Sequence, residues 1–364
     1  MKIAFYLDCV SPHQVPLARE VVKRVGADNF CYVYRDAVQE ERAALGWQMS
    51  SDADWFVHIG TQPDVAREWI ETADVMLTGF RDFELFARRL DKGLATFYMS
   101  ERWLKPIVAA GCSFPGRVRL LHPRFRRMVR AMKGCFRSEK FRYLPIGVHA
   151  QKDMTVLCGA QVVPHMMPWG YFIESFARAK NTSNRADSTC RILWVGRMLA
   201  LKGVDTIVKA FRKINRNAGG ADLTLVGEGP ERKKLERMSQ GLPVRFLPFQ
   251  PIDAIHRLMS DYDVFVFASN AQDGWGAVVN EALEAGLHVL GTHESGAAAT
   301  MLGADDLFLA GDWRRLSQLM MRCVNEKRAG TLKGQGIGEW SAEKAADRLL
   351  SVINDVRDRF CEKV

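Results

Sequence analysis

The sequence lacks any apolar run that approaches the roughly 18 residues a membrane-spanning helix requires. Its apolar stretches, such as residues 263–268, have the length of single strands. The amino-terminal stretch is interrupted by Asp8 and is too brief for the apolar region of a secretory signal. We therefore expect a cytoplasmic protein without transmembrane segments.

Paired cysteines are also missing. The eight cysteines stand singly, with no Cys-x-x-Cys pair and no zinc-like spacing to histidine. They are Cys9, Cys31, Cys112, Cys135, Cys158, Cys190, Cys323 and Cys361. This pattern is typical of free, buried thiols in a reducing compartment.

The chain is long enough for more than one domain. Its 364 residues, at a prior of about 150 per domain, suggest two globular domains. Hydrophobic residues make up 48% and charged residues 26%, which excludes a largely disordered chain and an integral membrane protein. No repeat of 20 to 50 residues is present, so a solenoid is excluded as well.

Short apolar segments alternate with amphipathic ones in both halves of the chain, which predicts parallel sheets wrapped by helices on both faces. The expected strands are 2–7, 30–34, 55–59, 74–78 and 95–99 in the first half, and 191–195, 223–226, 244–247, 264–267 and 288–290 in the second. The fold class is thus α/β, with two doubly wound, Rossmann-like domains facing a cleft.

The domain limits follow from a change in composition. Residues 174–190 are mostly polar and small, so they are interpreted as a linker. The first domain then covers residues 1–173 and the second residues 191–340. Residues 341–364 form a carboxyl-terminal helix that we expect to cross back and pack on the first domain.

Four ordered motifs stand in the second half. They are Val195-Gly196-Arg197-Met198 with Lys202-Gly203, Val226-Gly227-Glu228-Gly229-Pro230, Val244-Arg245-Phe246-Leu247, and the segment from Asp273-Gly274-Trp275-Gly276 to Asn280-Glu281-Ala282. In this order they resemble the nucleotide-sugar-binding domain of the retaining glycosyltransferases of family 4, which adopt the GT-B fold. The resemblance covers roughly residues 191–312.

Two cations follow the first strand of this domain. Gly196 lets the chain turn, so Arg197 and Lys202 can converge on one point. A planar guanidinium and a compact ammonium together suit a diphosphate and the negative charge that grows on it as it leaves. The resemblance implies this role for both residues; alone, they could be a solvated pair at a helix start.

Two acids lie eight positions apart at the last motif. Asp273 stands in a glycine-rich turn and Glu281 inside the following helix. Carboxylates accept hydrogen bonds from vicinal hydroxyls. The resemblance implies that Asp273 contacts the donor sugar, with Arg197 and Lys202 the other catalytic residues, and that Glu281 contacts the ribose. The family more often has Glu at the first position, which leaves the sugar open.

The other expected donor-binding residues surround these acids. Gly274, Trp275 and Gly276 form the turn, where glycine allows the backbone to approach a ligand closely. Phe249 follows the third strand of the domain and would line the nucleobase pocket. A capping Asp and an exposed helical Glu are the structural alternative for the two acids.

Metal binding is not expected. Two Asp-x-Asp strings exist, Asp52-Ala53-Asp54 and Asp261-Tyr262-Asp263, but both precede apolar strands. With Arg197 and Lys202 present, the diphosphate needs no divalent cation electrostatically. We expect no cofactor beyond the nucleoside diphosphate sugar, which is the donor substrate.

The resemblance is thin in the first domain. Its first loop ends in His13 and Gln14 at a helix start, without a pair of glycines. These two side chains could hydrogen-bond the acceptor or the donor phosphate, or could simply cap the helix.

The excess of positive charge is concentrated in residues 117–142. That segment holds ten Lys or Arg against one acid, so its net charge equals the +9 of the whole chain. Apolar residues recur there at helical spacing, which predicts a basic amphipathic helix on an anionic membrane. The residues expected to face the membrane are Arg119, Arg126, Arg127, Arg130, Lys133 and Arg137. A helix that faces the core with a solvated basic back is the alternative, and no nucleic-acid-binding module is present.

Together these features predict a retaining glycosyltransferase that moves a hexosyl group from a nucleoside diphosphate sugar to a saccharide or glycolipid acceptor, most simply a lipid-linked saccharide in cell-surface polysaccharide synthesis. The enzyme would be peripheral on the inner face of the membrane. Two alternatives remain: a GT-B sugar-nucleotide epimerase, and a non-catalytic protein that binds nucleotide sugars.

Overall fold

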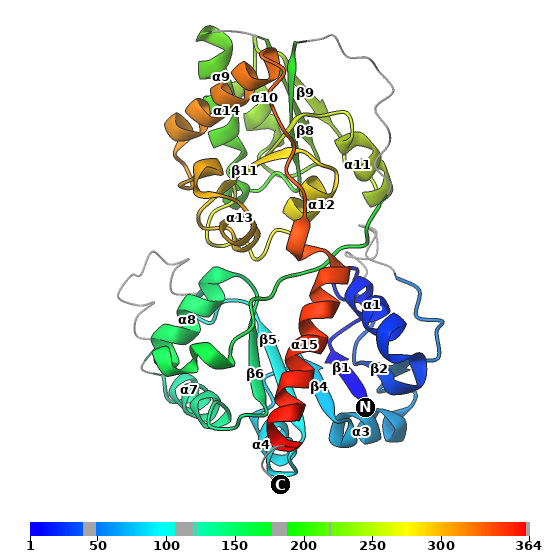
Figure 1. The fold of residues 1–364 in the computed structure, drawn as a ribbon. Helices are drawn as coiled ribbons and strands as arrows, with labels where there is room; N and C mark the ends of the chain where they lie inside the picture. Colours follow the sequence, from blue (N-terminus) through cyan, green and yellow to red (C-terminus); the bar gives the residue numbers. More distant parts are fainter. Residues whose placement is uncertain (39–48, 106–119, 121, 177–187, 218–219, 362–364) are drawn as a thin grey trace. The chain divides into compact units, whose positions relative to one another are not determined.

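The structure is a computed structural model that describes residues 1–38, 49–105, 120, 122–176, 188–217 and 220–361. The chain divides into two compact units (Figure 1). Unit 1 comprises residues 1–174 and 339–364, and unit 2 comprises residues 175–338. Each unit contains one six-stranded parallel sheet.

The sheet of unit 1 has the strand order β3-β2-β1-β4-β5-β6. Its strands are β1 (Ile3–Leu7), β2 (Phe30–Tyr34), β3 (Phe56–His58), β4 (Val75–Thr78), β5 (Ala95–Ser100) and β6 (Phe141–Pro145). The chain adds β2 and β3 on one side of β1 and then continues with β4 on the other side. The strand order therefore reverses between β1 and β4, the place where open α/β sheets bind ligands.

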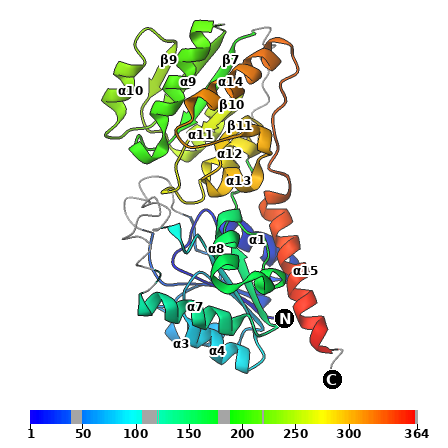
Figure 2. The ribbon, with the colours of Figure 1, turned by 90° about the vertical axis from the view of Figure 1, so that its left-hand side faces the viewer.

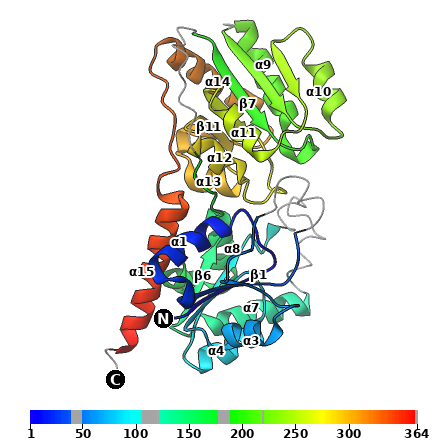
Figure 3. The same ribbon diagram turned by 90° about the vertical axis from the view of Figure 1, so that its right-hand side faces the viewer.

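Helices cover both faces of this sheet. On one face, α3 (Pro63–Thr72), α4 (Phe83–Asp91), α7 (Pro123–Cys135) and α8 (Val148–Cys158) share a hydrophobic core with the strands. On the other face, α1 (Val15–Val25) packs against α15 (Ala342–Cys361), as Figure 3 shows. An ion pair of 2.7 Å between Arg24 and Asp347 joins these two helices. The carboxyl-terminal helix is thus part of unit 1.

The basic segment 117–142 is not one helix. Helix α7 begins at Pro123, where proline is favoured because the first helical N–H needs no partner, and it ends at Cys135. Phe141 and Arg142 belong to the buried strand β6, which the helical reading of this segment missed. Arg117 and Arg119 lie outside the described residues. The prediction of a continuous helix was therefore wrong, because a run of positive charge does not mark where a helix ends.

The sheet of unit 2 has the order β12-β11-β10-β7-β8-β9. Its strands are β7 (Cys190–Val195), β8 (Ala221–Val226), β9 (Val244–Leu247), β10 (Val264–Phe267), β11 (His288–Thr292) and β12 (Leu307–Phe308). Cys190, which the sequence reading placed in the linker, already pairs with Ala221 in this sheet. The strand order reverses between β7 and β10.

The helices of unit 2 also form two layers (Figures 1 and 2). On one face, α9 (Val204–Asn217), α10 (Arg232–Met238) and α14 (Trp313–Arg328) enclose a core with β7, β8 and β10. The helices α11 (Ile252–Met259), α12 (Val278–Glu284) and α13 (Gly296–Met301) lie on the other face. A short 3-10 helix, η4 (Ala200–Lys202), follows β7 directly.

Within the part of the chain that the structure describes, we find no helix long and apolar enough to cross a membrane. Six of the cysteines are free and buried. Burial raises the pKa of the Cys31 thiol to about 12, so this cysteine stays protonated and unreactive at neutral pH.

Candidate functional site

Lys202 and Asp273 meet at the point where the strand order of unit 2 reverses. Lys202 closes η4 after β7, and Asp273 lies in the loop after the neighbouring strand β10. The Lys202 Nζ lies 2.6 Å from the Asp273 Oδ2, and the two side chains are only 22% and 16% exposed. In the absence of a ligand, each charge thus neutralises the other.

The backbone fixes this pair from both loops. The N–H of Asn270 donates to the Leu201 carbonyl at 2.9 Å, which ties the loop after β10 to η4. Gly203 has a φ of +63°, and a Cβ there would lie 2.3 Å from the Ala268 carbonyl oxygen. Only glycine permits this approach. The loop that carries Lys202 therefore packs directly on the end of β10.

Arg197 follows the carboxyl end of β7 and is exposed. Its neighbour Met198 is pinned to the loop after β8, because its N–H donates to the Glu228 carbonyl at 2.7 Å. In the described ranges, the Arg197 guanidinium makes no hydrogen bond or ion pair. It is therefore available to an anionic ligand at the edge of the sheet that also carries Lys202.

Glu281 is a buried carboxyl group on α12, in the helix that follows the Asp273 loop. The residue is 8% exposed, and its carboxyl group accepts no hydrogen bond from the side chains and backbone that the structure describes. Burial alone raises its pKa to about 7. A carboxyl group in this state gains hydrogen bonds when a ligand brings hydroxyl groups to it.

Trp275 is buried within unit 2, and its assignment as a donor-binding residue stays a prediction. It is 2% exposed, and its indole Nε1 donates to the Asn280 Oδ1 at 2.8 Å. Its carbonyl accepts the Ala297 N–H at 2.9 Å, which joins the Asp273 loop to α13. Asn280 is thus the hydrogen-bond partner that fixes this loop. The sequence analysis assigned it no role, although it stands beside Glu281 in the last of the four motifs.

Three other predicted residues differ in their surroundings. Gly276 has a φ of +89°, and a Cβ there would lie 2.6 Å from the Phe267 ring, so the glycine is required by packing. Gly196 still continues the sheet, because its N–H donates to the Val226 carbonyl at 3.0 Å. Phe249 lies after β9 with 45% of its surface exposed. Its proposed contact with a nucleobase stays a prediction.

Asp263 of the second Asp-x-Asp string has a structural role. One carboxylate oxygen accepts the Arg191 N–H at 2.9 Å, and the other lies 2.8 Å from the Lys327 Nζ. Asp52 of the first string accepts a hydrogen bond from the Ser50 hydroxyl at 2.6 Å. No group of three or more His, Cys, Asp or Glu gathers as a metal site among the residues described.

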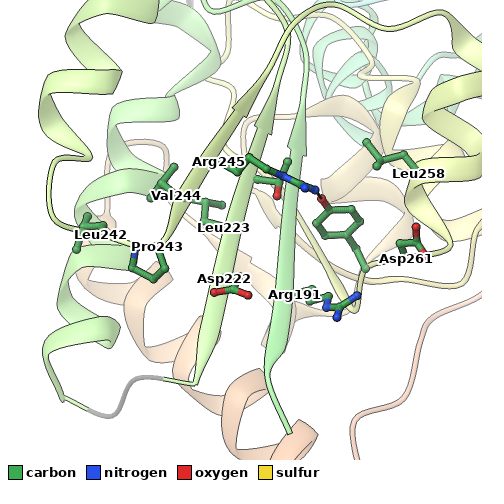
Figure 4. Close-up of a pocket in the computed structure, with 11 residues that line it drawn as sticks. Arg191, Asp222, Leu223, Leu242, Pro243, Val244, Arg245, Leu258 and Asp261 are labelled. Carbon is green, nitrogen blue, oxygen red and sulfur yellow. Dashed lines mark hydrogen bonds between the residues drawn. The ribbon is translucent and has the colours of Figure 1, made fainter. Parts of the chain in front are cut away.

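A pocket of about 640 Å³ in unit 2 lies at the opposite edge of the sheet (Figure 4). Arg191, Asp222 and Val244 line it from the first residues of β7, β8 and β9. The Arg245 guanidinium crosses it and donates to the Tyr262 hydroxyl at 3.0 Å. This pocket contains none of the predicted donor-binding residues, so it is separate from the Lys202–Asp273 pair.

Unit 1 contains a pocket of about 570 Å³ between the loops that follow β1, β4 and β5, here called the switch-point pocket. The predicted residues His13 and Gln14 both line it. The His13 ring stacks on the Tyr171 ring at 5.5 Å, and the Gln14 Nε2 donates to the Met99 sulfur at 3.8 Å. The Gln14 Oε1 is buried and has no hydrogen-bond partner among the residues that the structure describes.

The apolar side of α7 faces the protein core, which corrects the prediction that it faces a membrane. Met132, Cys135 and Phe136 are buried in the core of unit 1, and Phe125 and Met128 pack against it. The opposite side is solvated and basic, with Arg124, Arg126, Arg127, Arg130, Lys133 and Arg137 exposed. The helical spacing of the apolar residues therefore reflects packing against the core. This is the alternative that the sequence allowed, a helix that faces the core and has a solvated basic back.

Sequence comparison supports the interpretation of unit 2. Residues 189–326 match the family described as "Glycosyl transferases group 1". The GDP-mannose-dependent monoacylated alpha-(1-6)-phosphatidylinositol monomannoside mannosyltransferase of Corynebacterium glutamicum is 25% identical over 181 residues, 46% of this chain and 48% of that protein. The lipopolysaccharide core biosynthesis glycosyltransferase LpsD of Rhizobium meliloti is 32% identical over 139 residues, 34% of this chain and 38% of that protein. The chain spans half or less of these curated relatives.

Solved structures establish the fold over the full chain. HepE of Anabaena, in complex with UDP and glucose, has a TM-score of 0.58 at 15% identity and covers 99% of both chains. The apo form of the lipopolysaccharide outer core galactosyltransferase WaaB has a TM-score of 0.63 at 13% identity and covers 98% of this chain and 99% of its own. The two parallel six-stranded sheets thus have the GT-B fold, as the motifs predict.

Proposed function

We propose that this protein is a retaining glycosyltransferase that transfers a hexosyl group from a nucleoside diphosphate sugar to a hydroxyl group of a lipid-linked saccharide, in the synthesis of a cell-surface polysaccharide. The observation that carries the proposal is the 2.6 Å contact between Lys202 and Asp273 at the strand reversal of unit 2. The glycosyltransferase group 1 match and the mannosyltransferase and lipopolysaccharide relatives support it.

The Lys202–Asp273 pair suits a donor that carries both a diphosphate and a sugar. When the diphosphate binds, the Lys202 ammonium leaves the Asp273 carboxylate and pairs with phosphate oxygens. Asp273 then has a free oxygen to accept hydrogen bonds from sugar hydroxyls. Arg197 adds a second, exposed cation, so a metal ion is not required to balance the diphosphate. The buried carboxyl group of Glu281 accepts hydrogen bonds from the ribose hydroxyls.

The proposed transfer retains the configuration of the anomeric carbon. The bond between the anomeric carbon and the leaving phosphate oxygen breaks, and the acceptor oxygen forms its bond on the same face of the sugar. The proton of the acceptor hydroxyl passes to the leaving phosphate oxygen, so no protein nucleophile is needed. Arg197 and Lys202 stabilise the negative charge that grows on the diphosphate.

A thermal-shift panel tests the donor class. Nucleoside diphosphates and their sugars bind only the folded protein, so the correct donor should raise the melting temperature in proportion to the logarithm of its concentration. At 100 times its Kd the stabilisation should be about 2.7 kcal/mol. A panel in which no nucleotide shifts the melting temperature contradicts a nucleotide-sugar site. Formation of a glycosylated acceptor, rather than interconversion of the donor alone, separates a transferase from an epimerase.

We further propose that the basic side of α7 holds the enzyme at an anionic membrane. Six cations lie exposed on this helix and just after it, and none of them has an ion pair with any residue the structure describes. The apolar side of α7 packs against the protein core, so it does not insert into the membrane. The proposed attraction between α7 and the membrane is therefore electrostatic.

Flotation with vesicles that contain phosphatidylglycerol tests this attachment. Each exposed Arg or Lys near an anionic surface contributes about 1 kcal/mol, so Arg126→Gln with Arg130→Gln should weaken binding roughly 30-fold. Salt should release the unaltered protein, since the attraction is screened. The matched control, Lys23→Gln with Lys344→Gln, removes the same charge from α1 and α15. Flotation that ignores lipid charge, or that falls equally in the control, contradicts the proposal.

A further inference from the structure

A second pocket of unit 1 adjoins the switch-point pocket. It measures about 690 Å³, lies between α4 and α7, and is here called the α4–α7 pocket. Arg35, Phe80 and Arg81 line both pockets. The two hollows therefore adjoin at these three side chains.

Arg81 is held in place at this wall by uncharged partners. Its Nε donates to the Tyr98 hydroxyl at 3.1 Å, and its guanidinium lies 5.1 Å from the centroid of the Trp103 ring. Among the described residues it pairs with no carboxylate. A guanidinium that is fixed through its Nε and an aromatic face presents its two terminal nitrogens to an anion as a preorganised fork.

Further cations face the α4–α7 pocket. Arg127 reaches it from the exposed side of α7 and, like Arg81, has no ion pair within the described ranges. Arg35 lies over the Phe80 ring at 4.7 Å and is already paired with Asp36. The acids that line the pocket are Asp82, which is occupied as the cap of α4 at 2.9 Å from the Leu85 N–H, and Glu84. The pocket is thus lined by three arginines and two acids, and Arg81 and Arg127 have no ion pair among the described residues.

The switch-point pocket offers a different chemistry. Gln14 is 4% exposed, and its buried Oε1 has no hydrogen-bond partner within the described part of the chain. Glu101 is positioned by the Tyr171 hydroxyl at 3.3 Å and by the Lys105 Nζ at 3.4 Å. Asp8 is exposed at the same pocket. Amide and carboxylate oxygens that converge in this way accept hydrogen bonds from sugar hydroxyls.

We propose that unit 1 binds a sugar that carries a phosphate group. The sugar hydroxyls donate to Gln14, Asp8 and Glu101 in the switch-point pocket, and the phosphate lies between Arg81 and Arg127 in the α4–α7 pocket. Naming this ligand as the acceptor rests on the proposed function, whereas the preference for a phosphorylated sugar depends on unit 1 alone.

The proposal is tested by measuring the binding of glucose 6-phosphate to the full chain, with titration calorimetry or saturation-transfer NMR. Glucose 6-phosphate should bind at least tenfold more tightly than glucose or inorganic phosphate. Arg81→Gln and Arg127→Gln should each weaken it at least tenfold, because each removes a charge-assisted hydrogen-bonded pair. Lys23→Gln, which removes a charge from α1, is the matched control and should leave the affinity unchanged.

The same samples distinguish this proposal from the function assigned to unit 2. Lys202→Ala should not change the affinity for glucose 6-phosphate, and Arg81→Gln should not change the nucleotide response in the thermal-shift panel. A wild-type protein that binds no nucleotide contradicts the donor site only. Equal affinities for glucose and glucose 6-phosphate, or a loss that follows Lys202 instead of Arg81, overturn the phosphate site.

A competition experiment distinguishes a lipid phosphate from the phosphate of a soluble sugar. Dihexanoyl phosphatidylglycerol, which carries a phosphodiester and hydroxyl groups on a soluble lipid, is added to the complex with glucose 6-phosphate. Displacement that depends on Arg81 supports a phosphate that belongs to a lipid headgroup. Tight glucose 6-phosphate binding without displacement supports a soluble sugar phosphate.

Discussion

Lys202→Ala should lower the rate of sugar transfer about 100-fold or more, the cost expected when one preorganised donor to a developing negative charge is removed. The ammonium is 2.6 Å from Asp273 in the free protein, at the edge of the sheet where the strand order reverses. Because its interaction with the diphosphate strengthens as the bond to the sugar breaks, the loss should fall mainly on kcat.

Two variants accompany this measurement. Lys209→Ala removes an exposed lysine of α9 that pairs with Asp205 at 2.8 Å, and it should leave the rate unchanged. Lys202→Arg keeps the charge and should retain more activity than the alanine variant. Because Asp273 loses its partner in Lys202→Ala, circular dichroism should first show that the variant is folded. A folded Lys202→Ala enzyme with a rate within threefold of the wild type contradicts the proposed role.

How much of this could be predicted from the sequence depends on the kind of interaction. The strands of both sheets produce short apolar segments between helices, and this local pattern was sufficient for the fold class and for the positions of most strands. Strand β6 was missed because the helix was extended over the whole basic run, which ends with Phe141 and Arg142. Their burial in a sheet depends on a partner strand 45 residues away, with Phe141 opposite Thr96, which a local pattern does not contain.

The candidate site shows the same division. The motif around Lys202 and Asp273 indicated both residues, but their direct ion pair depends on two loops that meet at neighbouring strands. A tryptophan in a glycine-rich turn is compatible both with a ligand contact and with core packing. The burial of Trp275 and its hydrogen bond to Asn280 depend on tertiary contacts that the local sequence does not contain. The unpaired Arg81 could not be singled out, because it follows β4 in an ordinary polar loop.

Glu281→Gln should abolish a loss of stability that the wild-type protein shows as the pH rises. Burial raises the pKa of Glu281 to about 7 from its ordinary value of 4.5. Between these two values the unfolded chain has lost a proton that the folded protein still holds, so stability falls as the pH increases. The fall ends above pH 7, when the folded carboxyl group also ionises. It amounts to about 3 kcal/mol at 1.36 kcal/mol per pKa unit.

Melting temperatures at pH 5 and pH 8 measure this effect. About 2.5 kcal/mol of this loss falls between the two pH values, so the advantage of the Gln variant over the wild type should grow by roughly 5 to 10 °C, at about 2 to 4 °C per kcal/mol for a domain of this size. Asp205→Asn, which alters an acid of the same unit whose pKa is lowered, should not reproduce the gain. An advantage that is the same at both pH values contradicts the burial of an unpartnered Glu281 carboxyl group.

The same variant tests what Glu281 binds. If its carboxylate accepts the two ribose hydroxyls, the nucleotide favours the ionised form, so nucleotide affinity should increase as the pH rises through 7. The wild type should bind the nucleotide selected by the thermal-shift panel about tenfold more tightly than its 2′-deoxy analogue, as expected for one hydrogen bond to a charged group. Glu281→Gln should lose both the pH dependence and most of this preference. A wild-type protein that binds the ribose and deoxyribose forms equally would place the ribose elsewhere, even if the stability measurement confirms that the carboxyl group is buried.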